Sequence, residues 1–129
     1  LNHKVFLAQF DVIKNLARRE SCVIVGRCAD YALADNPDCF SVFIHAGMDF
    51  RVERIKKDYP DKVFKDDNKV IDFINKTDRK RANYYNFYSS KKWGDARSYD
   101  LSVDSSLLGI DKTVDFILDY AKMRYDLDI

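Results

Sequence analysis

The order of apolar and polar positions along the chain predicts helices that alternate with short strands. Apolar residues recur at helical spacing over residues 5–19, which indicates an amphipathic helix with a basic pair at its end. Residues 22–25 (Cys-Val-Ile-Val) and residues 40–46 are short, mostly apolar runs typical of buried parallel strands. Gly26 ends the first of these runs, so we expect the chain to turn there.

The second half of the chain continues this alternation. A charged helix is predicted over residues 49–59, where Pro60 marks its end, and a longer helix over residues 66–88. Residues 99–104 alternate between apolar and polar and predict a third strand, and residues 110–125 predict a final amphipathic helix. Short apolar strands separated by helices favour an α/β fold in which helices cover both faces of a parallel sheet.

The charged stretch between the second and third predicted strands interrupts the alternation. From about residue 51 to residue 93 it holds many charged residues and no strand-like apolar run, so we interpret it as a helical lid insertion. A segment with few core contacts opens at a small cost in free energy and can close over bound substrates. The alternative is a static helical hairpin whose arginines pair with nearby carboxylates.

The composition and the net charge limit which classes of protein and of binding partner fit this sequence. The 129 residues are enough for one domain, and 47% hydrophobic with 33% charged residues predict a folded, soluble protein. A formal net charge of +1 argues against binding to a DNA or RNA polymer, which needs a clearly basic surface. No apolar run reaches the length of about 20 residues that spans a bilayer, so we expect no membrane partner.

The three cysteines, Cys22, Cys28 and Cys39, form neither an even set nor a CxxC pair. Such a set supports neither a disulfide framework nor a zinc site, so we expect no metal site there, and reduced thiols in a cytoplasmic protein. Arginine is the better source of chemistry, because its guanidinium fork matches a phosphate.

The first arginine of interest directly follows a predicted buried strand. In open α/β sheets ligands bind beyond the carboxyl ends of the strands, where Gly26 lets the backbone approach a ligand and Arg27 offers donors to a phosphate. Asp30 follows three residues later, about one helical turn on. The alternative is an ordinary turn with a solvated arginine.

The insertion carries a second set of cations. Arg51 and Arg54 are three residues apart on a predicted helix and share one face, as do Asp78 and Arg81 on the next helix. Arginines on a mobile segment suit phosphoryl transfer, because charge on the moving group must be neutralised and water excluded. The alternative is a solvated helix crossed by salt bridges.

Two further features have simpler explanations. Residues 84–88 are aromatic-rich and are followed by Lys-Lys-Trp, a mixture found in single-strand nucleic-acid binders, but the near-neutral charge favours packing of a helix onto the sheet. His45 ends a predicted strand and has no partner visible in the sequence, so we expect a structural role for it. No G-x-x-x-x-G-K-[ST] phosphate loop occurs in the sequence.

Three segments, in this order, resemble the cytidylate kinase-like family. They are residues 23–31, residues 78–85 (Asp-Arg-Lys-Arg-Ala-Asn-Tyr-Tyr), and residues 93–106 with the helix that Gly109 and Ile110 open. The resemblance covers nearly the whole chain and implies the three-layer P-loop nucleoside monophosphate kinase fold with a helical lid, about three strands of its parallel sheet being present here. Family members transfer the γ-phosphate of ATP to CMP, dCMP or a similar nucleotide. This implies ATP and Mg²⁺ as cofactors and small-molecule nucleotides as partners.

The resemblance also implies roles for single residues. Arg27 matches the arginine that binds the acceptor phosphate. Asp30 lies near the acidic position beside it, although Cys28 and Ala29 intervene where the family pattern has Gly-Arg-Asp. The resemblance therefore leaves the role of this aspartate open.

The lid carries the other implied roles. Asp78 and Arg81 resemble the residues that hold the acceptor nucleotide, and Arg79 or Lys80 would face the transferring phosphates. The lid-base arginines of such kinases match Arg51 and Arg54. The implied substrate-binding residues are Arg27, Asp30, Arg51, Asp78 and Arg81. The implied catalytic residues are Arg54, Arg79 and Arg81.

One part of the family pattern is missing. Family members begin with a strand and a Gly-rich phosphate loop whose hydroxyl binds Mg²⁺, and neither is found in this sequence. The chain begins at Leu1 and not at a methionine, so we expect residues 1–129 to be a single kinase domain that lacks its N-terminal part and is inactive alone. The alternative is a non-catalytic, kinase-like domain that binds a nucleotide or regulates a partner.

Overall fold

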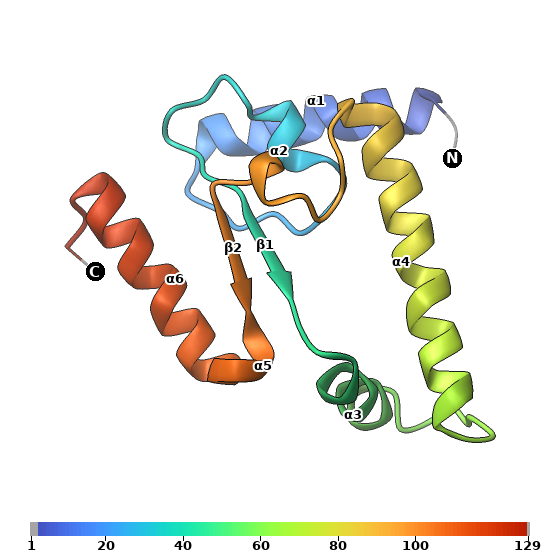
Figure 1. Cartoon of the computed structure of the whole chain (residues 1–129). Coiled ribbons are helices and arrows are strands. Elements are labelled where there is room, and N and C mark those ends of the chain that lie inside the picture. Colours follow the sequence, from blue (N-terminus) through green and yellow to red (C-terminus); the bar gives the residue numbers. More distant parts are fainter. Residues whose placement is uncertain (1–2, 129) are drawn as a thin grey trace. The chain divides into compact units, whose positions relative to one another are not determined.

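The computed structural model of the protein describes residues 3–128, and residues 1–2 and 129 lie outside this range. The expected first residue of the domain, Leu1, is therefore not among the described residues. The described part is a mixed α/β structure with six α-helices and a small parallel sheet of two strands (Figure 1).

The chain forms two compact units. Unit 1 comprises residues 1–41 and 80–100, and unit 2 comprises residues 42–79 and 101–129. The long helix α4 (Asp67–Ser89) contributes its first part to unit 2 and its second part to unit 1.

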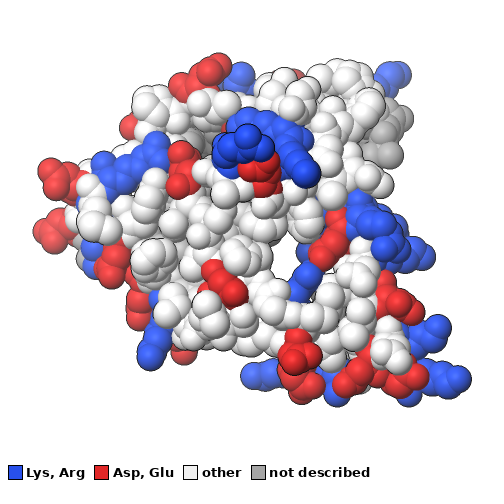
Figure 2. All heavy atoms as spheres, viewed as in Figure 1, with Lys and Arg blue, Asp and Glu red and all other residues white. Residues whose placement is uncertain are grey.

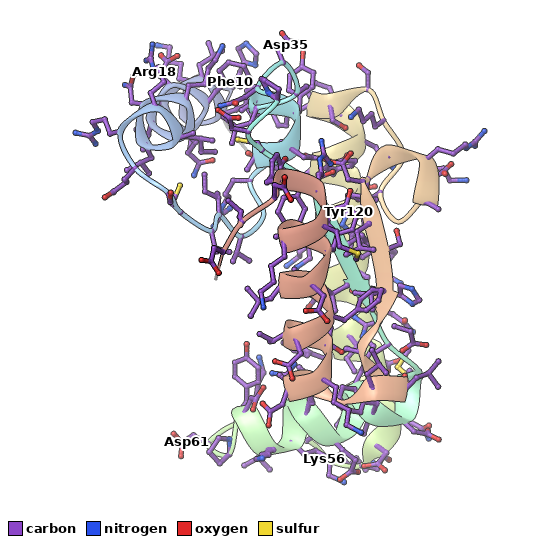
Figure 3. The ribbon with its side chains drawn as sticks, turned by 90° about the vertical axis from the view of Figure 1, so that its left-hand side faces the viewer. Phe10, Arg18, Asp35, Lys56, Asp61 and Tyr120 are labelled. Carbon is purple, nitrogen blue, oxygen red and sulfur yellow. The ribbon has the colours of Figure 1, made fainter. Side chains whose placement is uncertain are left out.

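Unit 1 is helical and contains α1 (His3–Arg19) and the short helix α2 (Ala29–Ala32). The spacing of its apolar residues gives α1 one apolar face, on which Phe6 is buried. Phe10 of the same helix points toward α2 (Figure 3), and its ring centroid is 6.0 Å from that of Tyr31. These contacts hold the short helix against the long one.

An aromatic cluster forms the core of unit 1. Phe6, Cys28 and Tyr85 are buried in it, and the ring of Tyr88 stacks on that of Phe6 with the centroids 3.9 Å apart. The partly buried members of the cluster are Phe10, Tyr84, Tyr88, Trp93 and Tyr99. The prediction that residues 84–88 serve packing is confirmed, but their partners come from α1 and the turn before α2 and not from a sheet.

Unit 2 contains the sheet. Strands β1 (Val42–His45) and β2 (Leu101–Asp104) run parallel and side by side (Figure 1), so that the first and last residues of one face those of the other. After β2 the chain forms the short helix α5 (Ser105–Leu108) and then α6 (Ile110–Tyr125), which runs alongside the strands (Figures 1 and 3). The second and third predicted strands are thus confirmed.

A second apolar cluster joins α3 (Met48–Asp58) to the first part of α4. Val52 of α3 is 5% exposed, and Val70 and Ile74 of α4 are 1% and 3% exposed. The expectation of few core contacts is wrong for this part of the insertion, because the apolar stripes of the two helices bury one another. Whether the insertion moves as a lid stays a prediction.

The sheet is smaller than the three strands that the sequence predicts. Residues 22–25 do not form a strand, and the side chains of Val23 and Val25 are 94% and 87% exposed. A β-branched run becomes a strand only when a neighbouring strand supplies backbone hydrogen bonds, and no described residue forms a ladder with this segment. A two-stranded sheet does not establish the three-layer P-loop arrangement.

The surface carries charges of both signs. Figure 2 shows Lys and Arg side chains interspersed with Asp and Glu, and this mixture is dense over α3 and the start of α4, at the lower right of the view. Within residues 3–128 no helix is long and apolar enough to cross a membrane.

Candidate functional site

The turn that the sequence singles out has an unusual backbone. Gly26, Arg27 and Cys28 all adopt left-handed conformations, with φ values of 72°, 60° and 55°. Glycine adopts this region without cost, whereas a residue with a β-carbon is strained there. Arg27 is exposed, and no ion pair involves it within residues 3–128. The turn therefore presents an unneutralised guanidinium to solvent.

The next residue, Cys28, anchors the turn and has little reactivity of its own. Its side chain is buried in the aromatic cluster at 4% exposure. Burial, and secondly the charge of Asp30, raise the pKa of the Cys28 thiol to about 11. Because the thiolate is the reactive species, this cysteine is a packing residue at neutral pH.

Asp30 contacts other protein groups through both carboxylate oxygens. Oδ1 accepts a hydrogen bond from the backbone N–H of Tyr31 at 2.9 Å, and Oδ2 accepts one from the hydroxyl of Tyr85 at 2.6 Å. Burial, followed by this hydrogen bond, raises the pKa of the Tyr85 phenol far above its ordinary value. The contact therefore joins a neutral phenol to a carboxylate.

The arginines of α4 that the sequence predicts to be catalytic have no carboxylate partner among the described residues. Arg79 and Arg81 are exposed, and no ion pair within residues 3–128 involves either of them. On the aromatic side of the same helix, burial raises the pKa of Tyr84, and the positive charge of Arg27 acts in the opposite direction. The positive charge of Arg27 therefore has an electrostatic effect on a residue of α4 within unit 1.

The two lid-base arginines behave differently, because each pairs with a carboxylate. Arg51 donates from Nη1 and Nη2 to the two oxygens of Asp78, each at 2.8 Å, and the side chains are 31% and 21% exposed. This bidentate pair joins α3 to α4. Arg54 pairs within α3 with Asp58 at 3.1 Å, where both side chains are about half exposed. Both arginines are therefore engaged in salt bridges, Arg51 between two helices and Arg54 within one helix.

The carboxyl ends of the two strands gather a set of small polar groups. His45 lies opposite Asp104 in the register, and the Asp104 carboxylate accepts hydrogen bonds from the backbone N–H and the hydroxyl of Ser106. These bonds, and secondly the charge of His45, hold the pKa of Asp104 below its usual range. Ser106 also accepts from Gly47 N–H at 3.2 Å, beside a shallow depression of about 350 Å³. The position of His45 opposite Asp104 could not be predicted from the sequence.

The structure divides the predicted site residues between the units. Unit 1 holds Arg27, Asp30 and Arg81, and unit 2 holds Arg51, Arg54, Asp78 and Arg79. Arg51 and Asp78 meet in a direct contact. Tyr85 is the residue that sequence reasoning missed, because no sequence signal pairs a phenol with a carboxylate 55 positions away.

Comparison with known proteins agrees with these motifs. Residues 1–107 match the model of the cytidylate kinase-like family. A solved structure, an uncharacterized protein from Eubacterium ventriosum ATCC 27560, superposes with a TM-score of 0.87 at 34% sequence identity. The match covers 94% of this chain and 66% of that one, so the chain spans a little under two thirds of its structural neighbour's length. No curated protein matches. The family match contains both the Gly26-Arg27 turn and the arginines of α4, and the chain therefore belongs to the cytidylate kinase-like family.

Proposed function

We propose that this kinase-like chain is the acceptor-binding part of a nucleoside monophosphate kinase, which transfers the γ-phosphate of ATP to CMP, dCMP or a similar nucleotide. The observation that carries the proposal is Arg27, an exposed cation without an ion pair in residues 3–128 that lies within a strained left-handed turn. A solvated arginine needs no such backbone, and strain of this kind concentrates where a side chain must be presented in one direction. A guanidinium so presented suits the phosphate of an acceptor nucleotide.

The arginines of α4 take the second role in the proposal. Arg79 and Arg81 are exposed and have no ion pair among the described residues, so they can neutralise the phosphoryl group in transfer. Arg51 and Arg54 require an exchange of partners, because each would have to leave a carboxylate in order to bind phosphate. We therefore rank these two behind the α4 arginines as catalytic or substrate-binding residues.

The proposal assigns ATP and Mg²⁺ to no residue of this chain. The 129 residues contain no Gly-rich phosphate loop, and within residues 3–128 no three His, Cys, Asp or Glu side chains gather in a group that could hold a metal ion. The residues present do not fit the metal–nucleotide complex. The same observation favours a second candidate function, a non-catalytic domain that binds a nucleotide or regulates a partner.

Measurements of phosphoryl transfer and of nucleotide binding distinguish the two candidate functions. The full-length protein is assayed for ADP release with CMP and dCMP, and both it and residues 1–129 are titrated calorimetrically with CMP. CMP-dependent ADP release by the full-length protein supports the kinase, whereas CMP binding without any transfer supports the non-catalytic domain. Residues 1–129 alone should show no transfer.

Arg27→Ala tests the assignment of the acceptor site. Loss of hydrogen bonds between an arginine and a phosphate should raise the acceptor KM, or weaken CMP binding, by about 10- to 100-fold. Arg19→Ala is the control, since it removes one exposed arginine from the same unit at the end of α1. An acceptor KM that is the same in Arg27→Ala and Arg19→Ala would contradict the assignment.

A further inference from the structure

The left-handed turn before α2 cannot hold its conformation by local preference. Arg27 at φ 60° and Cys28 at φ 55° are consecutive residues with β-carbons in a region that favours glycine. Two such residues persist only where the surrounding structure over-determines them. One backbone hydrogen bond closes the turn, from the N–H of Ala29 to the carbonyl of Gly26 at 3.2 Å, and the contacts made just after the turn must supply the rest of the support.

Two contacts anchor the chain on the α2 side of the turn. Cys28 is buried in the aromatic cluster, and Asp30 accepts the hydrogen bond from the Tyr85 hydroxyl at 2.6 Å. Tyr85 is itself well fixed, because it is 7% exposed and its ring stacks on that of Tyr99 with the centroids 5.8 Å apart. The hydroxyl therefore projects from a rigid part of α4 to the first turn of α2.

On the other side of the turn, residues 22–25 have no such anchor among the residues that the structure describes. Residues 22–25 belong to no helix or strand, and Val23 and Val25 are almost fully exposed. Arg27 lies between this segment and the anchored residues Cys28 and Asp30. The contacts on the α2 side of the turn therefore determine the direction of the Arg27 backbone.

We propose that Tyr85 and Asp30 are positioning residues, whose hydrogen bond fixes the left-handed turn and thereby the direction in which Arg27 presents its guanidinium to the phosphate monoester of an acceptor nucleotide. The identity of the ligand rests on the proposed function, whereas the control of the turn does not. Asp30 then acts through the turn and not on the ligand, in keeping with the engagement of both its oxygens. Tyr85 gains a role beyond packing.

The thiol of Cys28 reports opening of the turn. Only a thiolate reacts with iodoacetamide, and burial and Asp30 raise the pKa of this thiol to about 11, so alkylation at neutral pH requires exposure of Cys28. Cys22 is exposed and serves as an internal reference in the same sample, with the two cysteines resolved by mass spectrometry of peptides. The rate of alkylation is measured in residues 1–129 under native conditions.

Tyr85→Phe removes the hydroxyl, which bonds to Asp30 and also interacts with Tyr99, and keeps the stacked ring. We expect it to speed the alkylation of Cys28 about tenfold, the low end for loss of a hydrogen bond to a charged group, while Cys22 reacts at an unchanged rate. Tyr84→Phe is the matched control, since it removes a neighbouring hydroxyl that bonds to Gln9 of α1 at 3.3 Å and not to α2. It should alter the Cys28 rate by less than about twofold.

Asp30→Ala and the double variant establish that the two residues act through one bond. Asp30→Ala also removes a charge that raises the pKa of the Cys28 thiol, so its alkylation rate is compared with that of Asp30→Asn, which removes the same charge and keeps an acceptor oxygen for the Tyr85 hydroxyl. Asp30→Ala should speed the alkylation of Cys28 beyond the rate in Asp30→Asn, and adding Tyr85→Phe to Asp30→Ala should speed it no further, because the bond is already lost. Rates that multiply in the double variant would overturn the pairing. A Cys28 rate in Tyr85→Phe that equals the rate in Tyr84→Phe, or that only follows the loss of global stability in urea, would overturn the proposal.

A kinetic readout separates positioning from a general structural role. In the full-length kinase Tyr85→Phe should raise the acceptor KM about tenfold with kcat changed less than about threefold, whereas a loss of folded enzyme lowers kcat and leaves KM unchanged. An unchanged KM beside a lowered kcat overturns the proposal. If the full-length protein shows no phosphoryl transfer, the proposed function fails, and the alkylation rates still decide whether Tyr85 and Asp30 control the turn.

Discussion

Replacing Arg51 or Asp78 by alanine should lower the free energy of opening of α3, and the double variant should lose little more than either single variant. The reason is the bidentate contact, with two N–H···O distances of 2.8 Å between side chains that are 31% and 21% exposed. A charge-assisted bidentate pair with this degree of burial should show a coupling free energy of about 1 to 2 kcal/mol, above the usual value for an exposed pair. The pair would thus be a clamp between α3 and α4.

The chain offers a matched control pair in the same helix. Arg54 and Asp58 make a single contact at 3.1 Å, and both side chains are about half exposed, so solvent screens their attraction. An exposed pair four residues apart on a helix contributes about 0.3 to 0.5 kcal/mol. The two double-mutant cycles differ in geometry and burial but not in the types of residue.

Native-state hydrogen exchange of the α3 amides is the appropriate assay, because it gives the free energy of opening of this helix without assuming that both units unfold together. Each cycle needs the parent, the two single variants and the double variant. A coupling free energy for Arg51 and Asp78 no larger than that for Arg54 and Asp58 would refute the clamp.

The same cycle tests whether Arg51 binds substrate. If a phosphate of bound CMP draws the guanidinium of Arg51 away from Asp78, the coupling free energy should fall when CMP is present at saturation. A coupling that CMP leaves unchanged would assign Arg51 to the clamp and remove it from the acceptor site.

Three further predictions concern stability, pH and motion. Val70→Ala should destabilise the α3–α4 cluster by about 2 to 3 kcal/mol, whereas Val63→Ala, at a site 93% exposed, should change stability by less than about 0.5 kcal/mol in urea unfolding. Because the folded-state pKa of Asp104 is lowered, its contribution to stability is present above the ordinary pKa of about 3.9 and is lost as the pH falls through the folded value. Ser106→Ala should therefore raise the pKa of Asp104 in an NMR titration and reduce the acid sensitivity of unfolding, and an unmoved pKa would contradict this. If the insertion closes as a lid, a bisubstrate nucleotide should slow hydrogen exchange over residues 66–85 in the full-length protein, and unchanged exchange would favour a static hairpin.

The candidate site could be predicted only in part from the sequence. The Gly26-Arg27 turn and the arginines of α4 were identified by residue type and spacing, and the structure leaves Arg27, Arg79 and Arg81 exposed and without an ion pair in its described part. The sequence could not assign Asp30, because its partner Tyr85 comes from a different helix. Contacts between distant residues depend on how the helices and strands pack, so the pattern of residue types along the sequence does not predict them.

The four longer helices, α1, α3, α4 and α6, could be predicted from the sequence alone. Residues 110–125 were predicted to be helical and form α6 (Ile110–Tyr125), and the prediction of residues 66–88 differs from α4 (Asp67–Ser89) by one residue at each end. Helical periodicity and end signals are properties of neighbouring residues, so they can be read without tertiary information.

Only the tertiary structure determined that residues 22–25 form no strand and that Arg51 forms a salt bridge. A β-branched run is compatible with a strand, but its backbone groups need a partner strand, and no described residue supplies one to this segment. A charged helix is compatible both with free cations and with salt bridges, and the approach of α4 to α3 turns Arg51 into the partner of Asp78. Helices form from local contacts and could be predicted, whereas strand pairing and ion pairing join distant residues and are determined only when the chain has packed.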